Sequence, residues 1–122
     1  MTKILIIDDE THIRKMLKNL FERNGYETIA AEDGIQGIKL FKEHRPDLII
    51  TDLIMPEKEG LETIKEIKKL NPDTKIIAMS GGGVVDPETY LNIAKKFGAQ
   101  YSFSKPIDNE ELLLAVQNLL HS

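Results

Sequence analysis

The stretch Ile4-Leu5-Ile6-Ile7-Asp8-Asp9-Glu10 decides the fold, because four apolar residues are followed directly by three acids. A short, continuous apolar run rich in β-branched residues is typical of a strand buried on both faces. Leu48-Ile49-Ile50-Thr51, followed by Asp52, repeats the arrangement. Strands of this kind need helices on both sides of the sheet, so these two stretches predict a parallel α/β fold.

Strand patterns and helical patterns alternate along the whole chain. Strands are predicted at 4–7, 26–31, 48–51, 75–79 and 101–104, and a helix follows each of them. Turn residues mark several helix ends, and Asp86-Pro87-Glu88 and Asp108 are predicted to start the fourth and fifth helices. The apolar stripes of the first, second, third and fifth helices are, in order, Ile13, Met16, Leu17, Leu20 and Phe21; Ile35, Ile38 and Phe41; Leu61, Ile64, Ile67 and Leu70; Leu112, Val116, Leu119 and Leu120.

The order of the strands follows from this alternation. Strands separated by helices cannot form hairpins, so the sheet must be parallel with right-handed crossovers. The second and fifth strands are the least apolar and therefore belong at the edges. The order 2-1-3-4-5 satisfies this condition. We expect a doubly wound (βα)₅ domain, and 122 residues are enough for one such domain, 1–122, with a real core.

Bulk composition narrows the class of protein. With 41% hydrophobic and 30% charged residues, the chain should be globular rather than disordered. It has no cysteine, which excludes disulfides and thiolate chemistry, and its net charge of −4 argues against direct binding of nucleic acid. No apolar run is long enough to span a membrane, and a strand begins too early to leave room for a signal peptide. These features predict a cytoplasmic protein.

Polar residues follow four of the predicted strands. Asp8-Asp9-Glu10 follow the first strand, Asp52 the third, Ser80 the fourth and Lys105-Pro106 the fifth. An acid after a strand is commonly a helix cap or a turn residue. In an open parallel sheet, however, ligands bind at the carboxyl ends of the strands, beside the point where the strand order reverses. The coincidence of all four sets at this edge therefore predicts a functional site.

Charge balance indicates a metal at this edge. Ionised Asp8, Asp9 and Asp52 would repel one another, and the Lys105 ammonium offsets only one of the three charges. A divalent cation would offset the other two. Oxygen ligands without cysteine or clustered histidine select a hard cation, so the sequence predicts Mg²⁺ or Mn²⁺.

The same residues suit phosphoryl transfer. A carboxylate is a competent nucleophile toward phosphorus, and Asp52 stands alone after the central strand, whereas Asp8 and Asp9 form a pair. The transfer requires positioning and neutralisation of the phosphoryl oxygens more than acid–base chemistry. The metal, the Lys105 ammonium and the Ser80 hydroxyl can provide those contacts.

Taken together, these motifs resemble the receiver domain of two-component response regulators. The resemblance covers the whole chain and rests on 4–10, on Asp52-Leu53-Ile54-Met55-Pro56 with Gly60, on Met79-Ser80-Gly81 and on Lys105-Pro106. It implies a flavodoxin-like fold, and the order 2-1-3-4-5 is itself known from this family, so the two expectations are not independent.

The resemblance also implies a role for each residue of the site. Asp52 would receive phosphate from a sensor histidine kinase or a phosphotransfer protein, and Ser80 and Lys105 would hold the phosphoryl oxygens. Mg²⁺ would be bound by Asp8 or Asp9, by Asp52 and by the backbone carbonyl of Ile54. The peptide between Lys105 and Pro106 would be cis. Phosphorylation would repack the face formed by the fourth helix, the fifth strand and the fifth helix, where a downstream protein target would bind.

Three details depart from the family pattern or refine it. The position three before Lys105 usually holds an aromatic residue, but here it is Ser102, with Tyr101 and Phe103 on the opposite face of the strand. The segment from Ser80 to Gly98 is about three residues longer than usual. Ile54 and Gly82 lie at positions that influence attack by water on the phosphoryl group, and neither side chain can orient a water, so self-dephosphorylation should be slow.

Other classes of protein fit less well. A phosphatase of the haloacid-dehalogenase type needs a second acid two residues after the nucleophile, where this chain has Ile54. A nucleotide or flavin module needs a glycine-rich loop after the first strand, where acids would repel phosphate. The remaining alternative is a receiver-like interaction scaffold that takes no phosphate. We therefore expect a switch rather than an enzyme, catalysing at most its own phosphoryl transfer and slow self-dephosphorylation.

Overall fold

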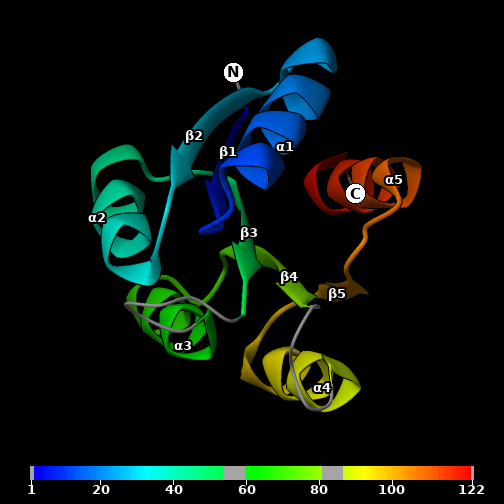
Figure 1. Ribbon diagram of the computed structural model, residues 1–122. Helices are drawn as coiled ribbons and strands as arrows, with labels where there is room; N and C mark the ends of the chain where they lie inside the picture. Colours follow the sequence, from blue (N-terminus) through cyan, green and yellow to red (C-terminus); the bar gives the residue numbers. More distant parts are fainter. Residues whose placement is uncertain (1, 54–59, 81–86, 122) are drawn as a thin grey trace.

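The computed structural model describes residues 2–53, 60–80 and 87–121. Five strands and five helices alternate along these residues (Figure 1). The strands are β1 (Lys3–Ile7), β2 (Glu27–Ala31), β3 (Leu48–Asp52), β4 (Lys75–Ser80) and β5 (Tyr101–Ser104). The helices are α1 (Thr11–Arg23), α2 (Gly34–His44), α3 (Gly60–Leu70), α4 (Pro87–Phe97) and α5 (Asn109–His121).

The five strands form one parallel sheet in the order β2-β1-β3-β4-β5, which confirms the predicted topology. Helices α1 and α5 cover one face of the sheet, and α2, α3 and α4 cover the other (Figure 1). Every residue of β3 is buried, as expected for the central strand of a sheet covered on both sides.

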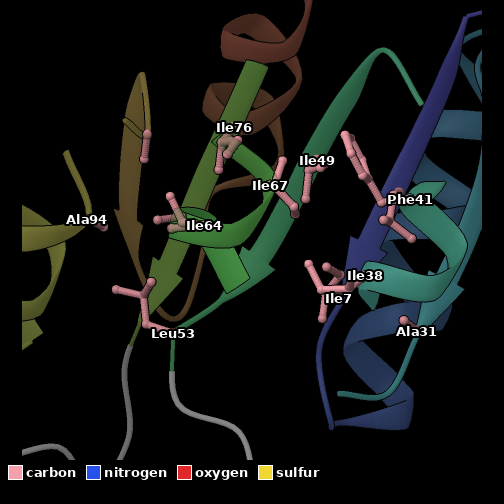
Figure 2. Close-up of a cluster of buried hydrophobic side chains, with 13 residues drawn as sticks. Ile7, Ala31, Ile38, Phe41, Ile49, Leu53, Ile64, Ile67, Ile76 and Ala94 are labelled. Carbon is pink, nitrogen blue, oxygen red and sulfur yellow. The ribbon is translucent and has the colours of Figure 1, made fainter. Parts of the chain in front are cut away.

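Each face of the sheet has its own hydrophobic core. Figure 2 shows the core under α2, α3 and α4, where Ile7 and Ile49 of the sheet meet Phe41 of α2 and Ile64 of α3. The second core packs the other faces of the strands against Phe21 of α1 and the apolar side of α5. Because both cores hold the same strands, the carboxyl ends of β1, β3 and β4 are fixed from two sides.

The predicted helix signals are largely confirmed. The Asp108 carboxylate accepts hydrogen bonds from the backbone N–H groups of Glu110 and Glu111, at 2.9 and 3.2 Å, as a capping residue does. Pro87 is the first residue of α4, whereas the predicted cap Asp86 lies outside the described residues. Among the described helices, none combines the length and apolarity needed to cross a membrane.

Two residues of the predicted apolar stripes are exposed to solvent. Ile35 is 59% exposed and Leu70 is 46% exposed. Both stand in the terminal turn of a helix, where a side chain has fewer neighbours on the sheet than one in the middle turns. The stripes predicted the inward face correctly but did not show where along the helix contact with the sheet ends.

The aromatic residues of β5 lie on the predicted face. Tyr101 and Phe103 pack beside the core under α1 and α5, with ring centroids 6.4 Å apart. Ser102 pairs in register with Ala78, which belongs to the core under α2, α3 and α4. Neighbours in register share a face of the sheet, so Ser102 faces the α4 side and places a small hydroxyl side chain at that position.

Candidate functional site

The carboxyl ends of four strands carry the polar residues of the candidate site. Asp8 follows β1, Asp52 ends β3, Ser80 ends β4 and Lys105 follows β5. Asp8 and Ser80 are fully buried, and Asp52 is 5% exposed. Backbone hydrogen bonds continue past the strands: the N–H of Lys105 donates to the carbonyl of Ser80 at 2.7 Å. The sheet therefore fixes the backbone from which these side chains extend.

Lys105 joins three carboxylates. Its Nζ lies 2.9 Å from Asp8 Oδ2, 3.1 Å from Glu10 Oε1 and 3.5 Å from Asp52 Oδ2. The Lys105 side chain is 14% exposed, so water screens these contacts only in part. The peptide between Lys105 and Pro106 is cis, as the resemblance implied. The ammonium thus connects the end of β1 to the end of β3.

The loop after β1 is held by several hydrogen bonds. Asp8 Oδ1 accepts from the backbone N–H of Glu10 at 2.9 Å. The Arg14 guanidinium donates to the backbone carbonyl of Asp8 at 2.7 Å and to Thr11 Oγ1 at 3.2 Å. The N–H of Asp8 donates to the carbonyl of Ala31 at 3.1 Å. These bonds set the direction in which the acids of the loop extend.

The donors at this edge fit a hard cation. Oxygens of Asp8, Asp9 and Glu10 lie within 4.8 Å of one another, and Asp9 is exposed to solvent. Carboxylate oxygens with open solvent positions suit Mg²⁺, which keeps several of its waters. Asp52 contacts Lys105, which also contacts Asp8 and Glu10 of this group. The predicted ligand Ile54 lies outside the described residues.

Burial dominates the electrostatics of Asp8. Loss of water around its carboxyl raises the pKa of Asp8, and the hydrogen bonds from the Glu10 N–H and the Lys105 ammonium offset this only in part. Burial alone would lower the pKa of Lys105, but the hydrogen bond to Asp8 and the charge of Asp52 outweigh it and raise that pKa. Lys105 therefore stays charged at neutral pH.

Ser80 brings a buried hydroxyl to the site. Its Oγ is buried and has no hydrogen-bond partner in the described part of the chain. A buried hydroxyl that lacks a partner costs stability, so natural sequences seldom retain one without a reason. The observation is consistent with a hydroxyl kept for a ligand.

Ser80→Ala should therefore change stability little. We expect the free energy of unfolding to stay within about 1 kcal/mol of wild type or to rise, because the substitution removes an unpartnered buried group and one small atom. Urea unfolding followed by circular dichroism measures this. A loss of about 2 kcal/mol or more would mean that the hydroxyl has a structural partner.

The structure brings together most of the residues that the sequence indicated. Lys105 contacts both Asp8 and Asp52, and its backbone N–H donates to the carbonyl of Ser80. The contact between Glu10 and Lys105 was not predicted, because the sequence showed Glu10 only as a third acid after a strand. A signal was available, since glutamate is a poor N-cap and yet occupies that position of α1.

The chain is similar to known proteins over nearly its whole length. A family model described as response regulator receiver domain matches residues 4–117. Sporulation initiation phosphotransferase F of Bacillus subtilis is 35% identical over 118 residues, which cover 97% of this chain and 93% of that protein. Chemotaxis protein CheY of the same organism is 36% identical over 120 residues, which cover 98% of each. The crystal structure of a response regulator receiver domain protein from Clostridium thermocellum has a TM-score of 0.90 at 34% identity and covers 98% of this chain and 94% of that one.

Proposed function

Because the chain belongs to the response-regulator receiver family, the phosphoacceptors of two-component systems, we propose that Asp52 is the residue that accepts the phosphoryl group. The observation that carries this proposal is the position of the Lys105 ammonium, which contacts both Asp8 Oδ2 and Asp52 Oδ2. A cation beside a nearly buried carboxylate favours the ionised, nucleophilic form. The family match supports a single receiver domain over 1–122.

In the proposed reaction, an Asp52 carboxylate oxygen attacks the phosphorus of the donor. A phosphorus–oxygen bond forms, and the bond between phosphorus and the leaving group breaks, with its electron pair going to the leaving group. Mg²⁺, held by Asp8, Asp9, Asp52 and the Ile54 carbonyl, would neutralise charge on the phosphoryl oxygens; Mn²⁺ could replace it. The Lys105 ammonium and the Ser80 hydroxyl would donate hydrogen bonds to the same oxygens.

The natural donor is proposed to be a sensor histidine kinase or a phosphotransfer protein. The output is proposed to be a change of the α4–β5–α5 face, to which a downstream protein binds. Two relatives are named for sporulation phosphotransfer and for chemotaxis. As a switch, the domain would catalyse at most its own phosphorylation and slow self-dephosphorylation.

Intact-protein mass after incubation with Mg²⁺ and acetyl phosphate tests the proposal. Wild type should gain about 80 Da, one phosphoryl group in place of a proton. Asp52→Ala should gain nothing, and neither should wild type with EDTA. A folded wild type that takes no phosphate from acetyl phosphate in Mg²⁺ would favour the scaffold alternative. Retention of the gain in Asp52→Ala would place the phosphoryl group elsewhere.

Self-dephosphorylation of the purified domain should be slow. Ile54 and Gly82, both outside the described residues, have no side-chain group that can orient an attacking water. We expect the phosphorylated form to persist for minutes or longer after the donor is removed, as followed by intact mass. Decay within seconds would contradict this expectation. Ile54→Asn, which supplies an amide, should shorten the half-life.

A further inference from the structure

Glu10 stands at the start of α1, at the position where a side chain often accepts a hydrogen bond from a backbone N–H of the first turn. It is the N-cap of α1, but its side chain makes no capping hydrogen bond. Glutamate is not among the residues that cap helices well, and Ser, Thr, Asp or Asn would be better there. Its Oε1 instead lies 3.1 Å from Lys105 Nζ, and its Oε2 lies 3.4 Å from Nε2 of the exposed His12.

The three contacts of Lys105 are unequal. Its Nζ is closer to Asp8 and Glu10, on the β1 side of the site, than to Asp52 Oδ2 at 3.5 Å. Glu10 is also the most exposed of the three partners, with 43% of its side chain accessible, against 0% for Asp8 and 8% for Asp52. Water can solvate a freed Glu10 carboxylate, so this is the contact that breaks at the lowest cost.

From this geometry we infer that Glu10 is a positioning residue: it holds the Lys105 ammonium on the β1 side before phosphorylation and releases it when the phosphoryl group arrives. The inference rests on the proposed roles of Asp52 and Lys105. An ammonium has three N–H donors, and Asp8, Glu10 and Asp52 already surround it. Two of these donors bond Asp8 and Glu10, and movement of the ammonium toward a phosphoryl oxygen on Asp52 would lengthen those two contacts. The Glu10 contact therefore opposes phosphorylation.

Two substitutions of Glu10 separate the contact from the charge. Glu10→Gln removes the negative charge, whereas Glu10→Asp keeps the charge but shortens the side chain by one methylene and withdraws it from Lys105. Both variants should be phosphorylated by acetyl phosphate about two- to fivefold faster than wild type at saturating Mg²⁺, the range expected for a partly exposed ion pair. Neither substitution removes a helix cap, since the Glu10 side chain makes no capping hydrogen bond, and aspartate is a better N-cap than glutamate.

Glu32→Gln is the matched control. Glu32 is an exposed acid after β2, on the loop next to Ala31, whose carbonyl accepts from the N–H of Asp8. Its neutralisation changes the charge near the same edge of the sheet without removing a contact of Lys105. We expect Glu32→Gln to be phosphorylated at the wild-type rate. Phosphoramidate, which carries less negative charge than acetyl phosphate, should show the same ratio of variant to wild-type rates, because a contact effect does not depend on donor charge.

The outcomes decide between clear alternatives. Acceleration in both Glu10 variants, with neither acceleration in Glu32→Gln nor dependence on donor charge, supports the inference. If Glu10→Asp behaves like wild type while Glu10→Gln and Glu32→Gln are both faster, the effect is general repulsion of the donor and the inference is wrong. Unchanged or slower phosphorylation of both Glu10 variants also overturns it. A wild type that takes no phosphate at all contradicts the proposed function itself.

Discussion

Lys105→Met is expected to lower the free energy of unfolding by about 3 kcal/mol in metal-free buffer. The substitution keeps most of the apolar stem but removes the cation that contacts Asp8, Glu10 and Asp52. Asp8 is fully buried and Asp52 is nearly so, and the substitution leaves these two carboxylates close together without the Lys105 ammonium. Removing one member of a buried ion pair is strongly destabilising, because the remaining charge is neither solvated nor compensated. Urea unfolding in EDTA measures the loss.

Two comparisons test this explanation. Asp8→Asn removes the most buried charge and leaves Lys105 in contact with Glu10 and Asp52. It should therefore lower the free energy of unfolding by about 1 kcal/mol or less. Addition of Mg²⁺ should recover part of the stability of Lys105→Met, because a bound cation compensates the same carboxylates and stabilises the folded state by mass action. Equal losses of unfolding free energy in Lys105→Met and Asp8→Asn would show that the Lys105–Asp8 pair stabilises the fold by its mutual contact and not by charge compensation.

Gly60→Ala is expected to lower the free energy of unfolding by about 2–3 kcal/mol. A Cβ at Gly60 would collide with the carbonyl oxygen of Asp52 and lie 2.6 Å from Leu53 Cα. Both are backbone atoms, so relief requires movement of α3 or of the end of β3. Since Asp52 is the proposed acceptor, the variant should also be phosphorylated more slowly by acetyl phosphate. Urea unfolding and intact mass measure the two effects separately.

Gly37→Ala is the control for this substitution. A Cβ at Gly37 would come within 2.5 Å of Ile7 Cδ1, which is the tip of a flexible side chain. Rotation of the Ile7 side chain can relieve the contact, and alanine favours the helix. The free energy of unfolding should therefore stay within about 1 kcal/mol of wild type. A Gly60→Ala variant as stable as Gly37→Ala would mean that the backbone of Asp52 yields easily and that the close approach is not required.

The identity of each element could be predicted from local pattern. The apolar run 4–7, the alternation of strands with helices and the cap Asp108 act through neighbours in the sequence, so a single chain reveals them. The sheet order followed from the composition of the strands, because edge strands tolerate water and central strands do not. The exposure of Ile35 and Leu70 could not be predicted, since it depends on where each helix ends relative to the sheet.

The sequence by itself determined the fold class and which side chains meet at one edge of the sheet, because strand polarity sends every carboxyl end to the same side. Only the tertiary structure decided which of these side chains touch. Lys105 lies 97 residues from Asp8 and 95 from Glu10, and no periodic pattern relates residues so far apart. The contacts depend on side-chain directions set by packing on both faces of the sheet. For the same reason, the close approach of Gly60 to Asp52 became visible only in three dimensions.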